Sequence, residues 1–306
     1  MNIPFLGNSR NGLAWFLLIF LALIWGSSFI LIKKGLQIYS PGEVGALRIF
    51  SAAIFLMPLA LKPLRNLSGR EFFLLFVAGL VGSFFPAFLF AKAQTQLNSS
   101  VTGVLNALTP LFTLIFGALL FAKPINRQQS VGLSLGFIGT AILVLAGSGG
   151  DWSDLNYYAF FVVMATICYG INVNFIKYNF EGMRPLVITS VSLLSVGPIA
   201  AIYLFGFTGF LAKTTSTPGV WLPLGGILAL GVVGTALALI IFNKLIKMST
   251  PVFSSSVTYI IPIVALLWGV LDNEQLLPGH LLGTVAIILG VWLANRPKKK
   301  AQKAIV

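Results

Sequence analysis

Apolar runs of about twenty residues follow one another along almost the whole 306-residue chain. Each run is long enough to cross the hydrocarbon core of a bilayer, which is about 30 Å thick, as an α-helix. Charged residues make up 9% of the chain and hydrophobic residues 57%, whereas about 25% of the residues in a soluble domain are charged. Such a chain lacks the polar surface that a water-soluble fold needs. We therefore predict an all-α membrane protein.

Turn-forming residues, mostly with proline, separate the runs and set their number. The first run ends in Lys33 and Lys34 without a small-residue cleavage site, so we interpret it as a membrane span and not as a signal peptide. The fourth and ninth runs begin where hydrophobicity resumes after a short polar stretch. We predict ten transmembrane helices, at about residues 13–32, 41–61, 72–91, 99–121, 129–146, 157–178, 185–207, 220–243, 251–271 and 278–295.

The second half of the chain repeats the first. A shift of 152 positions aligns glycines, a phenylalanine, a lysine and a proline without a gap: Gly79 with Gly231, Gly82 with Gly234, Phe90 with Phe242, Lys92 with Lys244 and Pro110 with Pro262. A shift of 144 aligns Trp25-Gly26 with Tyr169-Gly170, Lys33 with Lys177 and Pro41 with Pro185, and a shift of 151 aligns Gly132 with Gly283 and Gly139 with Gly290. Paired apolar residues carry little weight in a membrane protein, but these pairs are hard to obtain by chance.

Each half holds five predicted spans, and five is an odd number. The second half, residues 151–306, must then enter the membrane from the opposite side to the first half, residues 1–150. Inverted repeats of this kind are how many secondary transporters build two alternating gates around a site at the middle of the membrane. The alternative is a duplicated structural or receptor protein.

The net charge of +13 predicts topology and contact with anionic lipid, and we expect no nucleic-acid partner. If the N-terminus lies inside, most basic residues lie in inner segments, and the outer segments hold only Lys33, Lys34, Lys92 and Lys213. Inner loops of membrane proteins carry the excess of lysine and arginine. We therefore predict a multi-pass protein of a bacterial-type cytoplasmic (inner) membrane, with both termini cytoplasmic.

Polar side chains inside the spans are costly and tend to face a cavity or another helix. They occur at matching places in the two halves, in the first, fourth, sixth and ninth spans. A serine or threonine often bonds only its own helix backbone, whereas a buried amide needs several partners. The predicted substrate-binding residues from this group and a neighbouring apolar wall are Trp25, Ser28, Phe85, Asn106, Tyr169, Asn172, Asn174, Ser256 and Tyr259.

Arg48 is the one charge well inside a span. A charge at the bilayer centre costs at least about 2.5–3.5 kcal/mol on insertion scales, so its guanidinium must be paired, hydrated or near an interface. Two interpretations remain open for it. Arg48 either reaches a vestibule and attracts carboxylate or phosphate groups, or it caps helix carbonyls for structural reasons.

No Asp, Glu or His lies deep in any span, so the usual buried carboxylate relay for proton coupling is missing. The chain also has no phosphate-binding loop of the Gly-x-x-x-x-Gly-Lys-Ser/Thr type. We therefore predict transport down a solute gradient. The single cysteine, Cys168, excludes an intrachain disulfide and argues against a thiol metal site. We expect no metal, no cofactor and no catalytic residues.

Glycines at helical spacing occur in the fifth and tenth spans, at Gly132, Gly136, Gly139, Gly283 and Gly290. Small residues at this spacing allow helix backbones to approach closely in lipid. We predict a packing role for these two spans, either within one chain or across a homodimer.

These motifs resemble the EamA-type branch of the drug/metabolite transporter superfamily over almost the entire chain. The resemblance is carried by Leu23 to Phe29 (LIWGSSF), Asn106 to Pro110 (NALTP), Tyr259 to Pro262 (YIIP), Phe242 to Leu245 (FNKL) and the run from Gly283 to Gly290. It implies ten helices in two inverted repeats, with helices one, three, four, six, eight and nine around a central cavity and helices five and ten as a supporting pair. It also implies the movement, often outward, of amino acids and other small metabolites.

One family feature is present in only one half. Family members typically carry Gly-Glu just after spans four and nine; Glu274 fits the second copy, but the first reads Ala122-Lys123. This puts any role of the acid in the first half in doubt and favours a scaffold role.

The leading hypothesis is an alternating-access exporter of amino acids or similar polar organic solutes. An importer or exchanger of anionic solutes, with Arg48 as its anchor, is the second. A non-transporting scaffold is a third, and a membrane enzyme is disfavoured because no nucleophile–base pair or carboxylate dyad lies in the spans.

Overall fold

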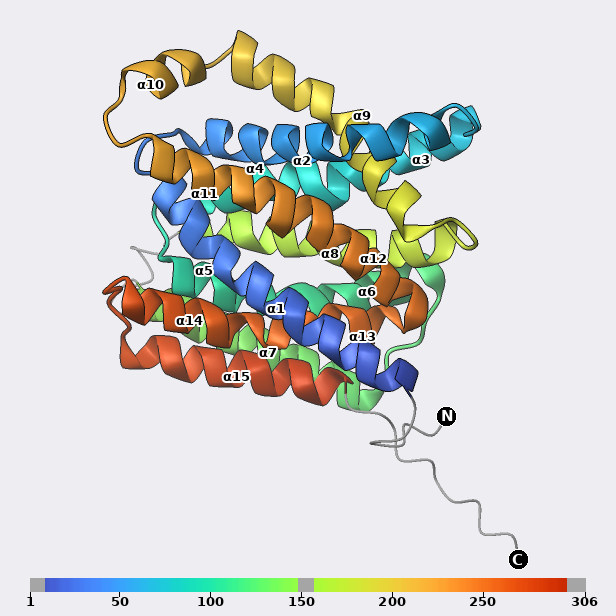
Figure 1. Cartoon of the computed structure of the whole chain (residues 1–306). Helices are drawn as coiled ribbons and strands as arrows, with labels where there is room; N and C mark the ends of the chain where they lie inside the picture. The colour runs from blue at the N-terminus through green and yellow to red at the C-terminus, as the bar shows by residue number, and fades with distance from the viewer. Residues whose placement is uncertain (1–8, 148–156, 296–306) are drawn as a thin grey trace, which may run out of the picture.

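The computed structural model describes residues 9–147 and 157–295, and every regular element in these ranges is helical. The helices lie side by side in one bundle, and the start of α1 and the end of α15 lie at the same end of that bundle (Figure 1). The predicted boundary between residues 150 and 151 and the basic tail after Asn295 lie outside the described ranges.

The helices of the first half begin where the turn-forming residues predicted. Ser40 caps the second helix: its hydroxyl accepts from the Glu43 backbone nitrogen (3.3 Å), and the Glu43 carboxylate accepts from the Ser40 nitrogen (2.6 Å). Ser68 and Glu71 form the same reciprocal cap, which satisfies backbone donors that a helix start leaves free. The elements are α1 (Ser9–Gly35), α2 (Pro41–Leu64), α3 (Gly69–Gly79), η1 (Leu80–Phe84), α4 (Phe85–Ala93), α5 (Ser99–Leu105), η2 (Asn106–Leu108), α6 (Thr109–Phe121) and α7 (Arg127–Gly147).

The second half follows the same order, with one extra short helix, α10, in a connection. The elements are α8 (Tyr158–Asn179), α9 (Pro185–Gly206), α10 (Phe210–Ser216), α11 (Trp221–Gly231), η3 (Val232–Leu237), α12 (Ala238–Met248), α13 (Pro251–Ser255), η4 (Ser256–Tyr259), α14 (Ile261–Leu271) and α15 (Pro278–Asn295). Several of these join into longer continuous helices, such as Trp221–Met248.

Eight helices in the described ranges are long and apolar enough to cross a membrane. They correspond to the predicted spans one to four and six to nine. The remaining two predicted spans form α7 and α15, of which α15 is a shorter apolar helix.

The helical irregularities repeat as the sequence does. The π-helical turns η1 and η3 begin at Leu80 and Val232, 152 positions apart. The 3₁₀ turns η2 and η4 each lie just before a proline of the repeat, Pro110 and Pro262. π-Helical turns inside α-helices are frequent at functional sites, and all four of these turns border the same internal cavity.

Glycines bring α7 and α15 into backbone contact. A Cβ atom added at Gly132 would lie 2.5 Å from the carbonyl oxygen of Gly290, and one at Gly290 would lie 2.7 Å from that of Gly132. Gly139 and Gly283 face each other in the same way. The predicted packing role is therefore confirmed within one chain. A homodimer would need another face of these helices and stays a prediction.

Candidate functional site

A cavity lies inside the bundle between the two halves of the chain. The volume open to the centre of a water molecule is about 90 Å³, which suits several waters or a small polar solute. Lining residues come from α1, α2, α3, η1, α4, η2 and α6 of the first half, and from α8, α9, η3, α12, α13 and η4 of the second. No described side chain of α7 or α15 lines the cavity, as the family resemblance implied. The ring it implied is incomplete, however, because α2 and α9 also line the cavity.

Arg48 is the buried cation of this cavity, with 8% of its surface exposed. Its Nε donates to the Thr235 hydroxyl at 2.8 Å, and its guanidinium lies within electrostatic range of the Tyr169 hydroxyl. Among the described residues no carboxylate pairs with it, and none lines the cavity. Of the two interpretations left open by the sequence, the geometry favours the cavity position over helix capping.

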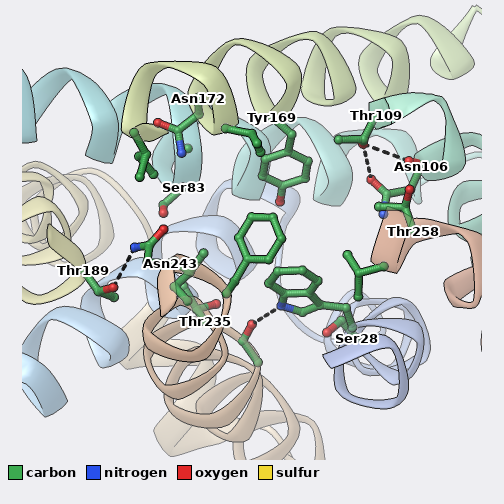
Figure 2. A pocket seen from close by; sticks show the side chains of 18 of the residues that line it. Ser28, Ser83, Asn106, Thr109, Tyr169, Asn172, Thr189, Thr235, Asn243 and Thr258 are labelled. Atoms are coloured by element: carbon green, nitrogen blue, oxygen red, sulfur yellow. Dashed lines mark hydrogen bonds between the residues drawn. The ribbon is translucent and has the colours of Figure 1, made fainter. Parts of the chain in front are cut away.

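Several acceptor atoms in the cavity wall have no hydrogen-bond partner in the described structure: Asn172 Oδ1, Asn243 Oδ1 and Ser192 Oγ. Leaving a buried polar group unpaired costs about 1–3 kcal/mol, so such groups usually have a partner, a water or a ligand. Figure 2 shows Asn172 and Asn243 on one side of the cavity, with Ser83 between them. On this side of the cavity, amide and hydroxyl groups therefore remain available to form hydrogen bonds with a solute.

A second polar group lies on the other side of the cavity, around Asn106, Thr109 and Thr258 (Figure 2). The Thr109 hydroxyl donates to the backbone oxygen of Asn106 at 2.9 Å and also lies 3.3 Å from its side-chain oxygen. The Thr258 hydroxyl donates to the Ser255 carbonyl at 2.9 Å. Asn106 and Thr258 are 152 positions apart, so equivalent positions of the repeat meet here.

Aromatic rings form part of the apolar wall, together with aliphatic side chains. Trp25 and Phe242 meet edge to face with their ring centroids 4.9 Å apart. Phe90 contacts Phe29 at 5.6 Å and Tyr169 at 5.9 Å. The Trp25 indole nitrogen donates to the Gly234 carbonyl at 2.9 Å, which fixes its ring against η3.

The cavity contains six of the ten residues predicted from the sequence, namely Trp25, Ser28, Arg48, Asn106, Tyr169 and Asn172. Three others, Phe85, Asn174 and Tyr259, do not line it. Phe85 is 46% exposed on the outside of α4, and Phe90 supplies the predicted apolar wall instead. The side chain of Ser256 lies outside the described part of the chain.

Asn174 and Tyr259 are engaged elsewhere. The Asn174 amide donates to the Thr113 carbonyl at 2.8 Å and to the Gly170 carbonyl at 3.0 Å, so it ties α8 to α6. The Tyr259 hydroxyl donates to the Val291 carbonyl at 2.9 Å, so it ties η4 to α15. Both residues serve packing between helices.

Sequence reasoning missed several polar lining residues that the repeat itself pairs. Ser192 lies 144 positions after Arg48, and Thr235 lies 152 positions after Ser83. The two offsets, applied to every polar residue, would have found both pairs. The sequence could also have indicated Asn243, because this residue follows Phe242 in the FNKL segment.

Acidic residues gather away from the cavity, at the end of the bundle where α1 ends. Lys33 bridges Asp272 (2.7 Å) and Glu274 (2.8 Å), and Lys34 also pairs with Asp272. Glu274 accepts from the backbone nitrogens of Ser99 (2.9 Å) and Ser100 (3.0 Å) at the start of α5. Burial alone raises the pKa of Glu274, but hydrogen bonds from Lys33, Ser100 and Ser99 outweigh it and lower the pKa to about 2.

At the other end of the bundle, the described residues contain no acidic copy of this ion network. There, Lys177, the repeat partner of Lys33, donates to the carbonyls of Ile246 (3.0 Å) and Ser249 (2.7 Å). The first half carries Lys123 near the position of Glu274, and its ammonium lies 5.5 Å from the centre of the Tyr178 ring. The contacts of Glu274 connect the end of α1 and the start of α5 with the segment after α14.

No group of three or more His, Cys, Asp or Glu that would hold a metal ion occurs among the described residues. Cys168 is a free, partly buried thiol.

Comparison with known proteins identifies the family. The profile of the EamA-like transporter family matches residues 12–145 and, a second time, residues 156–296. The chain belongs to the EamA-like transporter family. Two matches, one in each half, agree with the internal repeat in the sequence, and family members are transporters and not enzymes.

Relatives match over most of their length. The chain is 27% identical over 298 residues, covering 91% of this chain and 89% of the relative, to the uncharacterised inner membrane transporter YedA of Escherichia coli K12. It is 25% identical over 285 residues (91% and 93%) to a probable amino-acid metabolite efflux pump of Salmonella typhimurium. A crystal structure of another protein shares the fold, with a TM-score of 0.63, 17% identity, and coverage of 94% of this chain and 97% of that one.

Proposed function

We propose that this EamA-family protein is a secondary transporter that exports amino acids or similar small polar organic solutes. The observation that carries the proposal is a small internal cavity between the two halves of the chain, with Arg48 and unpartnered amide oxygens in its wall. A buried charge and unpaired acceptors are costly in a membrane interior, and a bound polar solute would satisfy both. A relative in Salmonella typhimurium, which is named a probable amino-acid metabolite efflux pump, points to the same class of solute.

The transport cycle in this proposal is alternating access between two inverted five-helix repeats. Ten helices cross the membrane, α7 and α15 included, and both termini lie in the cytoplasm. The repeated π-helical and 3₁₀ turns around the cavity support this, because they place irregular backbone at equivalent points of both halves. Helices that change shape at such turns allow each half to close one entrance in turn.

A second candidate, the import or exchange of anionic solutes, is favoured by one observation. Arg48 gives the cavity a positive charge, and no carboxylate among the described lining residues offsets it. A carboxylate or phosphate group would pair with the guanidinium through charge-assisted hydrogen bonds, which are roughly twice as strong as neutral ones. Such a solute needs no ammonium group.

Counterflow in proteoliposomes tests both candidates. Vesicles are loaded with one unlabelled solute and given a trace of the same labelled solute outside, so that exchange alone drives accumulation. We expect accumulation of neutral amino acids, and a loss of about tenfold or more in Arg48→Ala, because a hydrogen bond to a charged group contributes about 1.5–3 kcal/mol. Arg70→Ala, at an exposed arginine in the first turn of α3, is the matched control.

Accumulation of dicarboxylates or organic phosphates without amino acids would favour the second candidate. Wild-type vesicles that accumulate none of these solutes above protein-free vesicles would refute transport through this cavity.

A further inference from the structure

Arg48 and Ser192 occupy equivalent positions of the two repeats, 144 residues apart, and both line the central cavity. The same position of the repeat therefore holds a cationic side chain in the first half and a neutral hydroxyl in the second. Arginine only donates hydrogen bonds and carries a permanent positive charge, whereas a serine hydroxyl can accept. This difference gives the cavity a donor region and an acceptor region.

The donor region is centred on Arg48. Its side chain crosses from α2 to η3, where Nε donates to the Thr235 hydroxyl. The Thr235 hydroxyl in turn donates to the Leu230 carbonyl at 3.1 Å, so it is held as an acceptor and orients the guanidinium. Tyr169 lies close to the same guanidinium, and its hydroxyl points toward the middle of the cavity (Figure 2). Guanidinium and phenol together suit a carboxylate.

The acceptor region is fixed by a chain of hydrogen bonds through Thr189. The Thr189 hydroxyl donates its only proton to the Pro185 carbonyl at 3.0 Å, so its oxygen can only accept from Asn243. The Asn243 amide nitrogen accordingly donates to it at 2.8 Å. This assigns the amide orientation and leaves Asn243 Oδ1 as an unpaired, buried acceptor in the cavity wall.

Two further acceptors lie in the same region. Asn172 follows Tyr169 by one helical turn on α8, about 4.5 Å along the axis, and its Oδ1 has no partner. The Ser192 hydroxyl is also unpartnered, although most serines and threonines in these helices bond a carbonyl of their own helix, as Thr113 and Thr140 do. All three side chains can accept a hydrogen bond, and an ammonium group has three N–H bonds to donate.

We propose that the cavity selects neutral zwitterions, with the carboxylate on Arg48 and Tyr169 and the ammonium group on Asn172, Ser192 and Asn243. This inference rests on the proposed function and narrows its substrate class. An anion without an ammonium group leaves the acceptors unpaired. A cation leaves Arg48 without an anionic partner and adds a second positive charge to a cavity in which no described lining residue is a carboxylate.

Binding to the purified, detergent-solubilised protein, measured by calorimetry, tests the inference without any transport. The probes are L-alanine, propionate, which lacks the ammonium group, and ethylamine, which lacks the carboxylate; L-leucine with 4-methylpentanoate and isoamylamine forms a second matched set. We expect each amino acid to bind at least about tenfold more tightly than its acid, and its amine not to bind. Equal affinity of acid and amino acid, a tighter amine, or no binding of either amino acid overturns the inference.

Two variants assign the regions. Asn243→Leu, close in volume, should weaken L-alanine binding about tenfold and leave propionate binding unchanged. Arg48→Gln should weaken both. If Asn243→Leu weakens both ligands equally, the acceptor role is wrong. If the protein transports solutes but does not prefer amino acids over the matched acids and amines, only the zwitterion site is refuted. If the solutes bind with the predicted preference but no counterflow occurs, only the transport function is refuted.

Discussion

The indole nitrogen of Trp25 donates a hydrogen bond of 2.9 Å to the carbonyl oxygen of Gly234, inside the π-helical turn η3. The contact joins α1, in the first repeat, to a long helix of the second repeat beside the cavity. Its repeat counterpart would join Tyr169 to Gly82, but Tyr169 instead lies near Arg48. The two halves thus have π-helical turns at equivalent positions, but different side-chain contacts surround these turns.

Trp25→Phe removes this hydrogen bond and keeps most of the ring packing against Phe242. We expect the free energy of unfolding to fall by about 0.5–1.5 kcal/mol, the net contribution of a typical hydrogen bond. Thermal unfolding in detergent measures the change. Trp221→Phe is the control, because Trp221 is 74% exposed at the start of α11. Equal midpoints for the two variants would contradict a structural role for the Trp25 bond.

Gly82→Ala should reduce transport, because the added Cβ would collide with the amide of Asn172. The amide would have to leave its place in the cavity wall, so we expect weaker substrate binding at nearly unchanged stability. A binding titration checks this. Gly225→Ala, in a part of α11 where an added Cβ meets nothing within 4 Å, is the matched control and should bind like the wild type. Normal affinity in Gly82→Ala would show that the Asn172 amide does not contact the solute.

The sequence predicted the helices, the repeat and much of the cavity because these features leave strong linear signals. Prolines and serines mark where helices begin, and long apolar runs mark the spans. The prediction of lining residues failed where it depended on how a helix is rotated about its axis, because this rotation decides which side chains face the cavity. In a membrane both the lipid-facing and the packed faces of a helix are apolar, so composition does not distinguish Phe85, which faces outward, from Phe90, which is buried at the cavity.

Amide side chains show the same limit. Asn172 and Asn174 are two positions apart on α8 and so point in different directions. Asn172 faces the cavity, whereas Asn174 bonds the Thr113 carbonyl on α6. Which of the two bonds a neighbouring helix depends on how α6 packs, and a single sequence does not contain that information.

Glu274→Gln should destabilise the protein at neutral pH. Its carboxylate binds Lys33, the Ser99 and Ser100 nitrogens and both serine hydroxyls. Hydrogen bonds to a charged group contribute about 1.5–3 kcal/mol, and the glutamine retains only part of them. Glu181→Gln, at an exposed position, is the control and should unfold like the wild type. Unchanged thermal stability in Glu274→Gln would contradict the tie between α1, α5 and the segment after α14.

The pH dependence of this tie follows from the lowered pKa of Glu274, about 2 in the folded protein against about 4.3 for an unperturbed glutamate. A depressed folded-state pKa contributes stability that is complete above the unfolded pKa and is lost as the pH falls toward the folded one. The gap between wild type and Glu274→Gln should therefore stay constant from about pH 8 to 5. It should shrink between about pH 4.5 and 2. A gap that changes near neutral pH would contradict this assignment.

A pH gradient alone should not drive concentrative uptake. Among the described residues, no Asp, Glu or His lines the cavity. Asp272 and Glu274, which follow α14, are ion-paired with lysines at the end of α1, and the pKa of each carboxyl lies below its usual range. No lining side chain can therefore exchange a proton with water near neutral pH as the cavity changes its opening. Proteoliposomes with an imposed pH gradient and no internal solute should equilibrate L-alanine without accumulating it, while vesicles preloaded with unlabelled L-alanine accumulate the label. Accumulation driven by the gradient alone would show that a proton moves with the solute by a route other than a carboxylate in the cavity wall.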